Sequence, residues 1–363
     1  MISFFGIIHQ SGGCGAELLG AIHLLRRKSV KVRCIVPIDD PVAHGSRAKW
    51  LRSLGVTVVN YRPGMFERCP VLVSFGEDTC FDYMREYADR PKHMVWTSGM
   101  SFGVDVEYNA LRDGLIDEFF FQTPENAQRV APQILKGCGL DPIQIKARQN
   151  YIPFIDPDCE LMPLAIEERS ENEFVVGRAT RDDPEKWHDE SWRMYGNILV
   201  PQHKSLLVRV AGWGQNALEK VGSPCDPTSK WAGYFNLQLN GHIYGSQEMA
   251  AFYKNLHVLL HYYPFVESFG YSTAQAMLAG AIPIGANEGG FKALIQHGET
   301  GFLAHSPDEA TYYASSLAFD ETRRQRMSEA ARRWVIEEGP GSVEKTWPWW
   351  RDLLDVLGMP IPN

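Results

Sequence analysis

The stretch that indicates the fold most clearly is residues 267–290, which read ESFGYSTAQAMLAGAIPIGANEGG. A carboxylate, Glu267, stands just before a helical pattern that ends at Gly280, a residue type that often closes a helix. A short apolar strand follows over 281–285, and a second glycine-rich turn comes after it. Helix N-termini and glycine turns at strand ends can hold a phosphate or a sugar hydroxyl. The stretch therefore predicts a ligand site within an α/β domain.

The rest of the chain continues this alternation of strand and helix on both sides of a boundary region. Short β-branched runs alternate with amphipathic segments, which is typical of parallel strands joined by helices. Residues 150–172 interrupt the rhythm with a proline-rich and then a strongly charged segment. We therefore predict two doubly wound domains, 1–155 and 156–342, followed by a final helix within 343–363. The strands expected in the first domain are 2–8, 30–37, 57–61, 70–74, 93–97 and 118–122, with the last one closing the sheet. Those expected in the second domain are 174–176, 204–212, 258–261 and 281–285.

Composition excludes several classes of protein. At 363 residues the chain has the length of roughly two domains. Its 44% hydrophobic and 22% charged residues are typical of a globular protein. The net charge of −8 argues against a general polyanion binder. The seven cysteines contain no C-x-x-C pair, so we expect reduced thiols in a cytoplasmic protein. The longest apolar stretch, 276–286, is too short to span a membrane, so no transmembrane segment is expected.

With its motifs in this order, the chain resembles the group 1 (family 4-like) retaining glycosyltransferases of the GT-B fold. Their pattern is a Glu, a second Glu eight residues later, an AMxxGxPV segment, a Gly-Gly turn and GxTGxL. The matching positions here are Glu267, Gln275, the segment 276–284, the pair Gly289 and Gly290, and 298–303. Gln275 departs from the pattern, because the family's second Glu contacts the nucleotide ribose. A glutamine amide can still bond a ribose hydroxyl.

A second element, residues 175–187, is similar to the family's strand and loop whose Arg and Lys hold the donor diphosphate. The resemblance assigns these roles to Arg178 and Lys186. The loop is longer here than in many members of the family, so Arg181 could replace Arg178 as the phosphate ligand. Taken alone, such cations are usually solvated surface charges. The other donor-binding residues that the resemblance implies are Gly13, Gly15, Ser268, Phe269, Gly270, Gly289 and Gly290.

The implied activity is transfer of a sugar from a nucleoside diphosphate sugar, UDP- or GDP-linked, to a hydroxyl acceptor with retention of configuration. Glu267 would contact the donor sugar, and Arg178 and Lys186 would neutralise the diphosphate. The resemblance implies no obligatory metal or cofactor. It also implies two facing Rossmann-like domains, with the acceptor on the first, the donor on the second, and the last helix packed back on the first. The acceptor itself is not identified; Thr97, Ser98 and Glu107 are weak candidates for contacting it.

Three alternatives remain open. One is glycosylation of a hydroxymethylated base in phage-type DNA, by an enzyme of the same fold. The others are a sugar-nucleotide epimerase and a non-catalytic nucleotide-sugar-binding protein. Glu267 alone could be a charge that stabilises a helix start, and Glu17 could reach an acceptor. The spacing of His257 and His261 could suggest a metal site, but residues 258–260 between them are expected to form a strand, which argues against the helical i, i+4 pairing.

Overall fold

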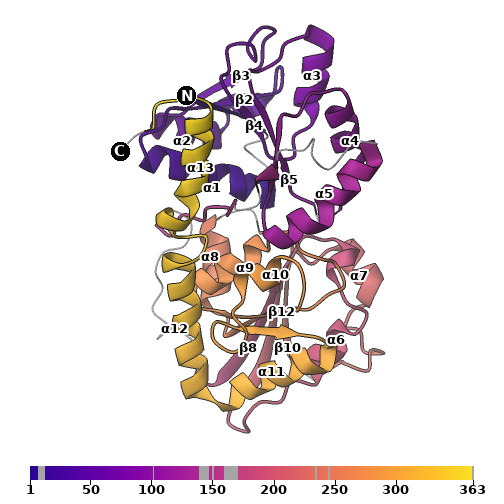
Figure 1. Cartoon of the computed structure of the whole chain (residues 1–363). Coiled ribbons are helices and arrows are strands. Elements are labelled where there is room, and N and C mark those ends of the chain that lie inside the picture. The colour runs from indigo at the N-terminus through magenta and orange to yellow at the C-terminus, as the bar shows by residue number, and fades with distance from the viewer. Residues whose placement is uncertain are drawn as a thin grey trace. The chain divides into compact units, whose positions relative to one another are not determined.

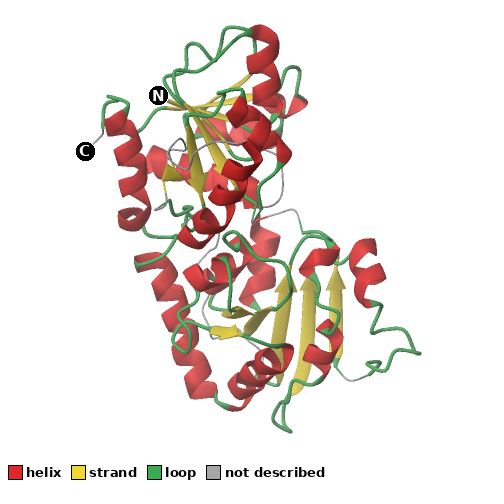
Figure 2. Cartoon of the chain, turned by 45° about the vertical axis from the view of Figure 1, so that its right-hand side comes forward, coloured by secondary structure: helices red, strands yellow, loops and turns green. Residues whose placement is uncertain are grey.

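The computed structural model describes residues 1–6, 13–100, 102–138, 147–148, 151–158, 171–233, 235–243 and 246–361. The chain divides into two compact units, Met1–Ile155 with Val343–Asn363, and Asp156–Ser342. Each unit is a parallel sheet with helices packed on its faces (Figures 1 and 2). Among the described residues, no helix combines the length and the apolar character needed to cross a membrane.

The sheet of the first unit has seven strands in the order β3-β2-β1-β4-β5-β6-β7. Their bounds are β1 (Ile2–Phe5), β2 (Val32–Val36), β3 (Thr57–Asn60), β4 (Leu72–Ser74), β5 (Met94–Ser98), β6 (Glu118–Phe121) and β7 (Ala147–Arg148). β1 pairs in parallel with β2 on one side and β4 on the other, so the strand order reverses there. Ligands of open α/β sheets bind at such a reversal.

One expectation about this sheet was wrong. Residues 118–122 were predicted to close it, but β7 pairs beyond β6. β7 has only two residues, which is too short to produce a recognisable pattern of hydrophobicity.

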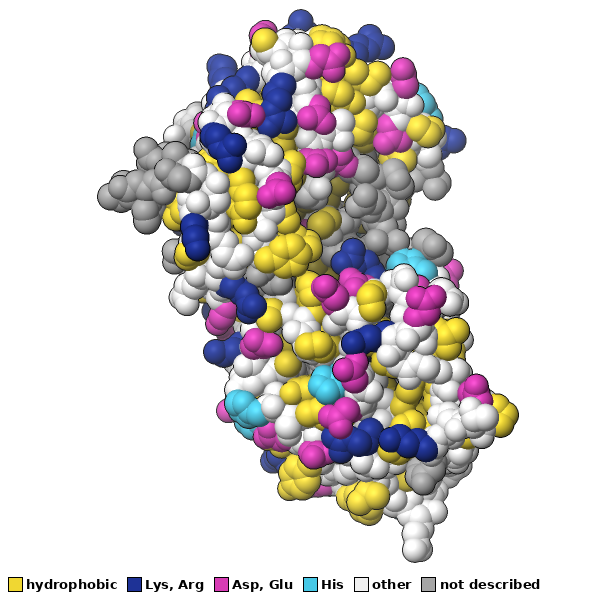
Figure 3. Space-filling model, turned by 90° about the vertical axis from the view of Figure 1, so that its right-hand side faces the viewer, with side chains coloured by type: hydrophobic (Ala, Val, Ile, Leu, Met, Phe, Trp, Pro, Cys, Tyr) yellow, Lys and Arg dark blue, Asp and Glu magenta, His cyan; other side chains and the backbone are white. Residues whose placement is uncertain are grey.

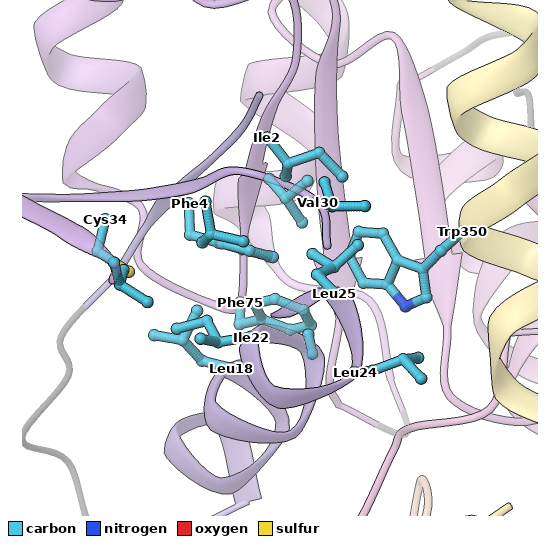
Figure 4. Close-up of a cluster of buried hydrophobic side chains, with 14 of the residues drawn as sticks. Ile2, Phe4, Leu18, Ile22, Leu24, Leu25, Val30, Cys34, Phe75 and Trp350 are labelled. Carbon is cyan, nitrogen blue, oxygen red and sulfur yellow. The ribbon is translucent and has the colours of Figure 1, made fainter. Parts of the chain in front are cut away.

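The helices of the first unit cover both faces of the sheet. They are α1 (Gly13–Arg27), η1 (Pro41–His44), α2 (Ser46–Ser53), α3 (Thr79–Tyr87), α4 (Asp105–Arg112), α5 (Pro124–Cys138) and α13 (Val343–Val356). Leu18, Ile22 and Leu25 of α1 pack against Ile2 and Phe4 of β1, with Trp350 beside them (Figure 4).

The last helix, α13, is part of the core of the first unit. The ring of Trp349 meets that of Phe120 on β6 edge-on, with 3.6 Å between centroids, and lies 5.0 Å from that of Tyr151. Trp350 makes a further edge contact with Phe4 at 5.9 Å. These contacts tie residues near the end of the chain to the first strand.

The sheet of the second unit has six strands in the order β10-β9-β8-β11-β12-β13. They are β8 (Glu173–Ala179), β9 (Ser205–Ala211), β10 (Asn236–Asn240), β11 (Val258–His261), β12 (Ile282–Ala286) and β13 (Phe302–Ala304). The helices are η4 (Pro184–Lys186), α6 (Ser191–Gly196), α7 (Gln215–Val221), α8 (Ser246–Lys254), α9 (Tyr271–Leu278), α10 (Gly290–Leu294), α11 (Pro307–Phe319) and α12 (Glu321–Glu337). β8 pairs in parallel with both β9 and β11, so the strand order reverses between β8 and β11.

Residues 267–290 lie beside this reversal, because they contain α9 and β12, and β12 pairs with β11. α9 ends just before Gly280, whose φ of +81° is the left-handed conformation expected after a helix. The strand that follows, β12, is buried along its whole length. The prediction of an α/β fold with doubly wound parallel sheets is confirmed.

Candidate functional site

The candidate site lies in the second unit, in the loops that follow β8, β11 and β12. Lys186 ends η4 after β8, Glu267 lies between β11 and α9, and Gly289 caps α10 after β12. Because the three strands are parallel neighbours, their carboxyl ends share one edge of the sheet. The fold thus brings together residues that are up to 103 positions apart, from 186 to 289.

Glu267 is the centre of this cluster. Its Oε1 atom accepts hydrogen bonds from the Lys186 ammonium and from the Tyr263 hydroxyl, each at 2.6 Å. The side chains of Lys186 and Glu267 are only 9% and 17% exposed. An ion pair shielded in this way is screened less by water and salt than one on the surface. The carboxylate is therefore held in one position by two charge-assisted hydrogen bonds.

Aromatic rings surround the Lys186 ammonium. Its Nζ lies 3.5 Å from the centroid of the Phe265 ring and 5.5 Å from that of Tyr263. Burial lowers the pKa of Lys186 below its ordinary value, and the neighbouring Glu267 carboxylate opposes that shift. The site thus holds a poorly solvated cation, whose attraction to an incoming anion is stronger than that of a hydrated one.

The structure separates the two arginines that were candidates for the diphosphate. Arg178, on β8, has no exposed surface; its guanidinium lies 4.2 Å from the Trp187 ring and 4.9 Å from the Tyr263 ring. Its Nε and Nη2 atoms have no hydrogen-bond partner within the described part of the chain. Arg181 is 62% exposed, with Asp183 at 3.9 Å. Arg181, not Arg178, is therefore the arginine that a solvent-borne ligand can reach in this structure.

A glycine turn packs against the Glu267 loop. The amide of Gly290 donates to the Glu267 carbonyl at 2.7 Å. A Cβ atom on Gly289, whose φ is +57°, would lie 2.5 Å from that carbonyl oxygen and 2.6 Å from the Val266 side chain. A Cβ atom on Gly290 would clash with the Phe269 carbonyl. The two glycines are needed so that the loop after β12 can fix the loop that carries Glu267.

The other predicted donor-binding residues of this unit occupy different environments. Phe269 is buried and packs edge-on against Tyr271, with centroids 4.9 Å apart, so it anchors the loop. Gly270 begins α9 with a φ of +96°. Ser268 and Gln275 are half-buried. Of this group, Ser268 and Gln275 have polar side chains that can bond a ligand.

His261 also lies in this cluster, although the sequence did not predict it there. Its Nε2 accepts from the Ala179 amide at 3.2 Å, and its Nδ1 lies 3.3 Å from the Thr273 hydroxyl. Burial, reinforced by Arg178 and Lys186, holds the pKa of His261 well below its ordinary value. The ring is therefore neutral, with its proton on Nδ1 because Nε2 is an acceptor.

The spacing of His257 and His261 has a structural cause. His257 Nδ1 accepts from the Val175 amide at 3.0 Å, so both rings bond backbone amides of β8. Within the described residues, no group of three His, Cys, Asp or Glu side chains is placed to hold a metal ion.

The candidates in the first unit are mostly buried. Gly13 and Gly15 belong to the first turn of α1, where Gly15 lines a small hollow together with Cys14 and Gly76. Thr97 and Ser98 end β5 with buried side chains.

Glu107 lies on α4. It is 2% exposed and accepts from the indole of Trp96 at 3.0 Å, and burial raises its pKa. In this structure Thr97, Ser98 and Glu107 lack the exposure that contact with an acceptor requires.

Glu17, a residue that the sequence suggested could reach an acceptor, is a buried carboxyl. It lies on α1, has no exposed surface and accepts from the Gln122 amide. Burial raises the pKa of Glu17 to about 8. The signal was present in the sequence, because Glu17 falls on the same helical face as the apolar Ala21 and Leu25.

The architecture matches a known fold. Two doubly wound units with parallel sheets, and a last helix that belongs to the first unit, are the arrangement of the GT-B fold. The profile of the family described as "Glycosyl transferases group 1" matches residues 165–334, nearly all of the second unit. The second unit is thus similar to the group 1 glycosyl transferases.

Solved structures show the same fold over the whole chain. HepE of Anabaena, in complex with UDP and glucose, is 13% identical with a TM-score of 0.68, covering 98% of this chain and 99% of HepE. Sucrose-phosphate synthase of Thermosynechococcus elongatus is 13% identical with a TM-score of 0.70 and the same coverage. At this identity, the likeness establishes the fold alone.

A curated relative matches over a shorter stretch. N-acetyl-alpha-D-glucosaminyl L-malate synthase of Bacillus anthracis is 39% identical over 74 residues. The match covers 20% of this chain and 19% of that enzyme, so it spans about a fifth of the relative's length.

Proposed function

We propose that this protein transfers a hexose from a nucleoside diphosphate sugar to a hydroxyl acceptor, with retention of configuration at the sugar carbon. The family assignment of residues 165–334 supports transfer of a glycosyl group. The observation that carries the proposal is the shielded pair of Lys186 and Glu267 at the carboxyl ends of the strands. Such a pair offers a cation for a diphosphate and a carboxylate for sugar hydroxyls within 2.6 Å of each other.

The donor would bind to hydrogen-bonding atoms of the cluster that the contacts described above do not use. An ammonium has three N–H donors, and Lys186 gives one of them to Glu267. We assign its other donors, together with the exposed guanidinium of Arg181, to the diphosphate. Lys186 and Tyr263 both bond Oε1 of Glu267, so Oε2 is the atom that would accept from a sugar hydroxyl. Gln275 on α9 would bond the ribose.

The chemistry follows from these positions. The bond between the sugar C1 and the diphosphate oxygen breaks, and the acceptor oxygen forms a bond to C1 on the same face. The acceptor proton passes to the departing phosphate oxygen. Lys186 and Arg181 offset the negative charge that grows on the diphosphate as the bond breaks, which is the main catalytic contribution of such a site.

In this proposal, Arg178 is a positioning residue and not a ligand. It is buried between Trp187 and Tyr263, and Tyr263 bonds Glu267 directly. The first unit would take the acceptor, a role for which Thr97, Ser98 and Glu107 are too buried to be assigned. We also propose a cytoplasmic location, because the cysteines of the described residues are free thiols.

Nucleotide binding tests the proposal first. Titration calorimetry with UDP, GDP and ADP should show one clear ligand, and UDP is the first choice because HepE was solved with UDP and glucose. At 100 times its dissociation constant, that ligand should stabilise the protein by about 2.7 kcal/mol. The matching sugar nucleotide should then be consumed by the protein and left intact by Glu267→Gln. Equal consumption by the variant would remove Glu267 from the mechanism.

A further inference from the structure

A separate pocket opens on the flank of the second unit, between α6, the end of α7 and residues 221–231. Its volume is about 460 Å³, within the range of small-ligand pockets, roughly 300–1,000 Å³. Its walls contain none of the residues of the Lys186 and Glu267 cluster. α6 and α7 lie on the same side of the sheet, at the right in Figure 1.

Two tryptophans, Trp192 and Trp231, are among the residues that line this pocket. Trp192, on α6, donates its indole N–H to the Gly222 carbonyl at 2.9 Å, which ties α6 to the end of α7. Trp231 is half-buried and packs directly on Gly196, where a Cβ atom would lie 2.5 Å from the indole ring. Trp192 is buried, so the half-buried ring of Trp231 is the aromatic surface that a ligand could contact, and the packing on Gly196 holds it in place.

Of the five charged residues that line the pocket, Asp189, Glu190 and Arg193 form ion pairs, and the Lys230 ammonium lies 5.2 Å from the centroid of the Trp231 ring. Lys220 bonds Asp189 at 2.6 Å. Arg193 bonds Glu190 at 2.8 Å and Asp308 at 2.6 Å. On this flank, acidic and basic side chains are interspersed without a field of one sign (Figure 3). Mutual pairing of this kind favours a neutral ligand over an anion or a cation.

Hydroxyl groups complete the lining. Thr228 donates its hydroxyl to Asp226 at 2.7 Å, and Ser229 accepts from the Trp231 amide at 3.3 Å. These short-range bonds hold the segment in one conformation. Each hydroxyl is both a donor and an acceptor, so each can still bond a partner that carries hydroxyls.

We propose that this pocket, which we call the Trp231 pocket, binds a neutral saccharide. Sugar rings present apolar C–H faces that lie on aromatic rings, while their hydroxyls exchange hydrogen bonds with carboxylates and hydroxyls. The pocket offers both kinds of partner and a balanced charge. Saccharide binding there does not depend on the proposed transfer; if both hold, the pocket would retain a glycan acceptor or product on the enzyme.

Oligosaccharide binding by the full-length protein tests this proposal. The probes are oligosaccharides of glucose, N-acetylglucosamine and galactose, each two to four units long. Saturation-transfer NMR measures their binding to the protein. At least one should bind the wild type, and Trp231→Ala should weaken that binding about tenfold or more, equivalent to about 1.4 kcal/mol. Thr228→Trp, which fills the pocket from an exposed position, should do the same at an unchanged unfolding temperature.

Two controls separate the outcomes. Tyr312→Ala removes an aromatic ring that is 67% exposed in the same unit but does not line the pocket, and it should bind as the wild type does. Glu267→Gln should also leave oligosaccharide binding unchanged. Binding that is lost in Glu267→Gln and kept in Trp231→Ala and Thr228→Trp would place the sugar in the donor site and overturn the proposal. So would the absence of binding to every probe at millimolar concentration.

Discussion

Replacing Lys186 with methionine should weaken both the fold and nucleotide binding, and the larger effect should be on binding. Methionine has a side chain of similar length, and the substitution removes an ammonium that lies 2.6 Å from the Glu267 carboxylate. Breaking a fully buried pair costs about 3–5 kcal/mol. This pair keeps 9% and 17% exposure, and the burial that lowers the pKa of Lys186 is relieved in the variant. We therefore expect a loss of about 1–2 kcal/mol in unfolding free energy.

The loss in UDP affinity should be larger. In the proposed site, a charge-assisted hydrogen bond from Lys186 to the diphosphate would contribute about 1.5–3 kcal/mol, so the dissociation constant should rise roughly 10- to 150-fold. Titration calorimetry measures the affinity, and urea unfolding followed by tryptophan fluorescence measures the stability. The companion variant Glu267→Gln keeps the ammonium and removes its counter-ion. It should bind UDP as tightly as the wild type or more tightly.

The matched control is Lys220→Met in the same unit. Lys220 also bonds a carboxylate at 2.6 Å, but the pair is 36% and 76% exposed. Its loss should cost less than about 1 kcal/mol of stability and leave UDP affinity unchanged. Wild-type affinity in Lys186→Met, or an equal loss of affinity in Lys220→Met, would refute the assignment of Lys186 to the diphosphate.

Four further substitutions test three separate parts of the account. Arg181→Met should weaken UDP binding by about 1.5–3 kcal/mol, measured by calorimetry. Arg178→Met, which changes a buried residue, should bind UDP within about twofold of the wild type. A larger loss of affinity in Arg178→Met than in Arg181→Met would make Arg178 the diphosphate ligand. Gly289→Ala places a Cβ atom 2.5 Å from the Glu267 carbonyl oxygen at a φ of +57°. It should therefore lower the unfolding free energy in urea by about 1–3 kcal/mol and slow sugar transfer. An unchanged transfer rate would show that the turn does not position Glu267. Burial raises the pKa of Glu17 to about 8 in the folded state. The folded protein then holds this proton more tightly than the unfolded chain, and unfolding free energy should fall as pH rises from about 5 to about 8, by at most about 1.4 kcal/mol per unit. Glu17→Gln should flatten that slope, and an equal slope in both proteins would contradict the burial of an ionisable group there.

Elements with strong hydrophobic patterns were predictable, and weakly patterned edge strands were not. β11 was predicted at its observed bounds, because it is buried on both faces and reads as a continuous apolar run. β10 (Asn236–Asn240) was missed, since its residues are polar or half-exposed at the edge of the sheet. β7 was missed because two residues carry no periodicity.

The site was predictable where a motif of the resemblance carries the information. Glu267 and the glycine turn lie within one such motif, and Lys186, which bonds Glu267, lies in a second one. The burial of Arg178 depends on Trp187 and Tyr263, which reach it from other loops. Tyr263 itself follows β11 as one aromatic residue among several, and nothing in its spacing marks it as the donor of a hydrogen bond to Glu267.

The central claim is that this chain moves a sugar with retention, using the Glu267 cluster. Proton NMR of an α-linked sugar nucleotide, carrying the base that binds most tightly, tests it most directly. We predict that the sugar leaves the wild type first as the α anomer, and that Glu267→Gln binds the donor but leaves it intact. First appearance of the β anomer, a donor left intact by the wild type, or equal turnover by the variant would contradict the account.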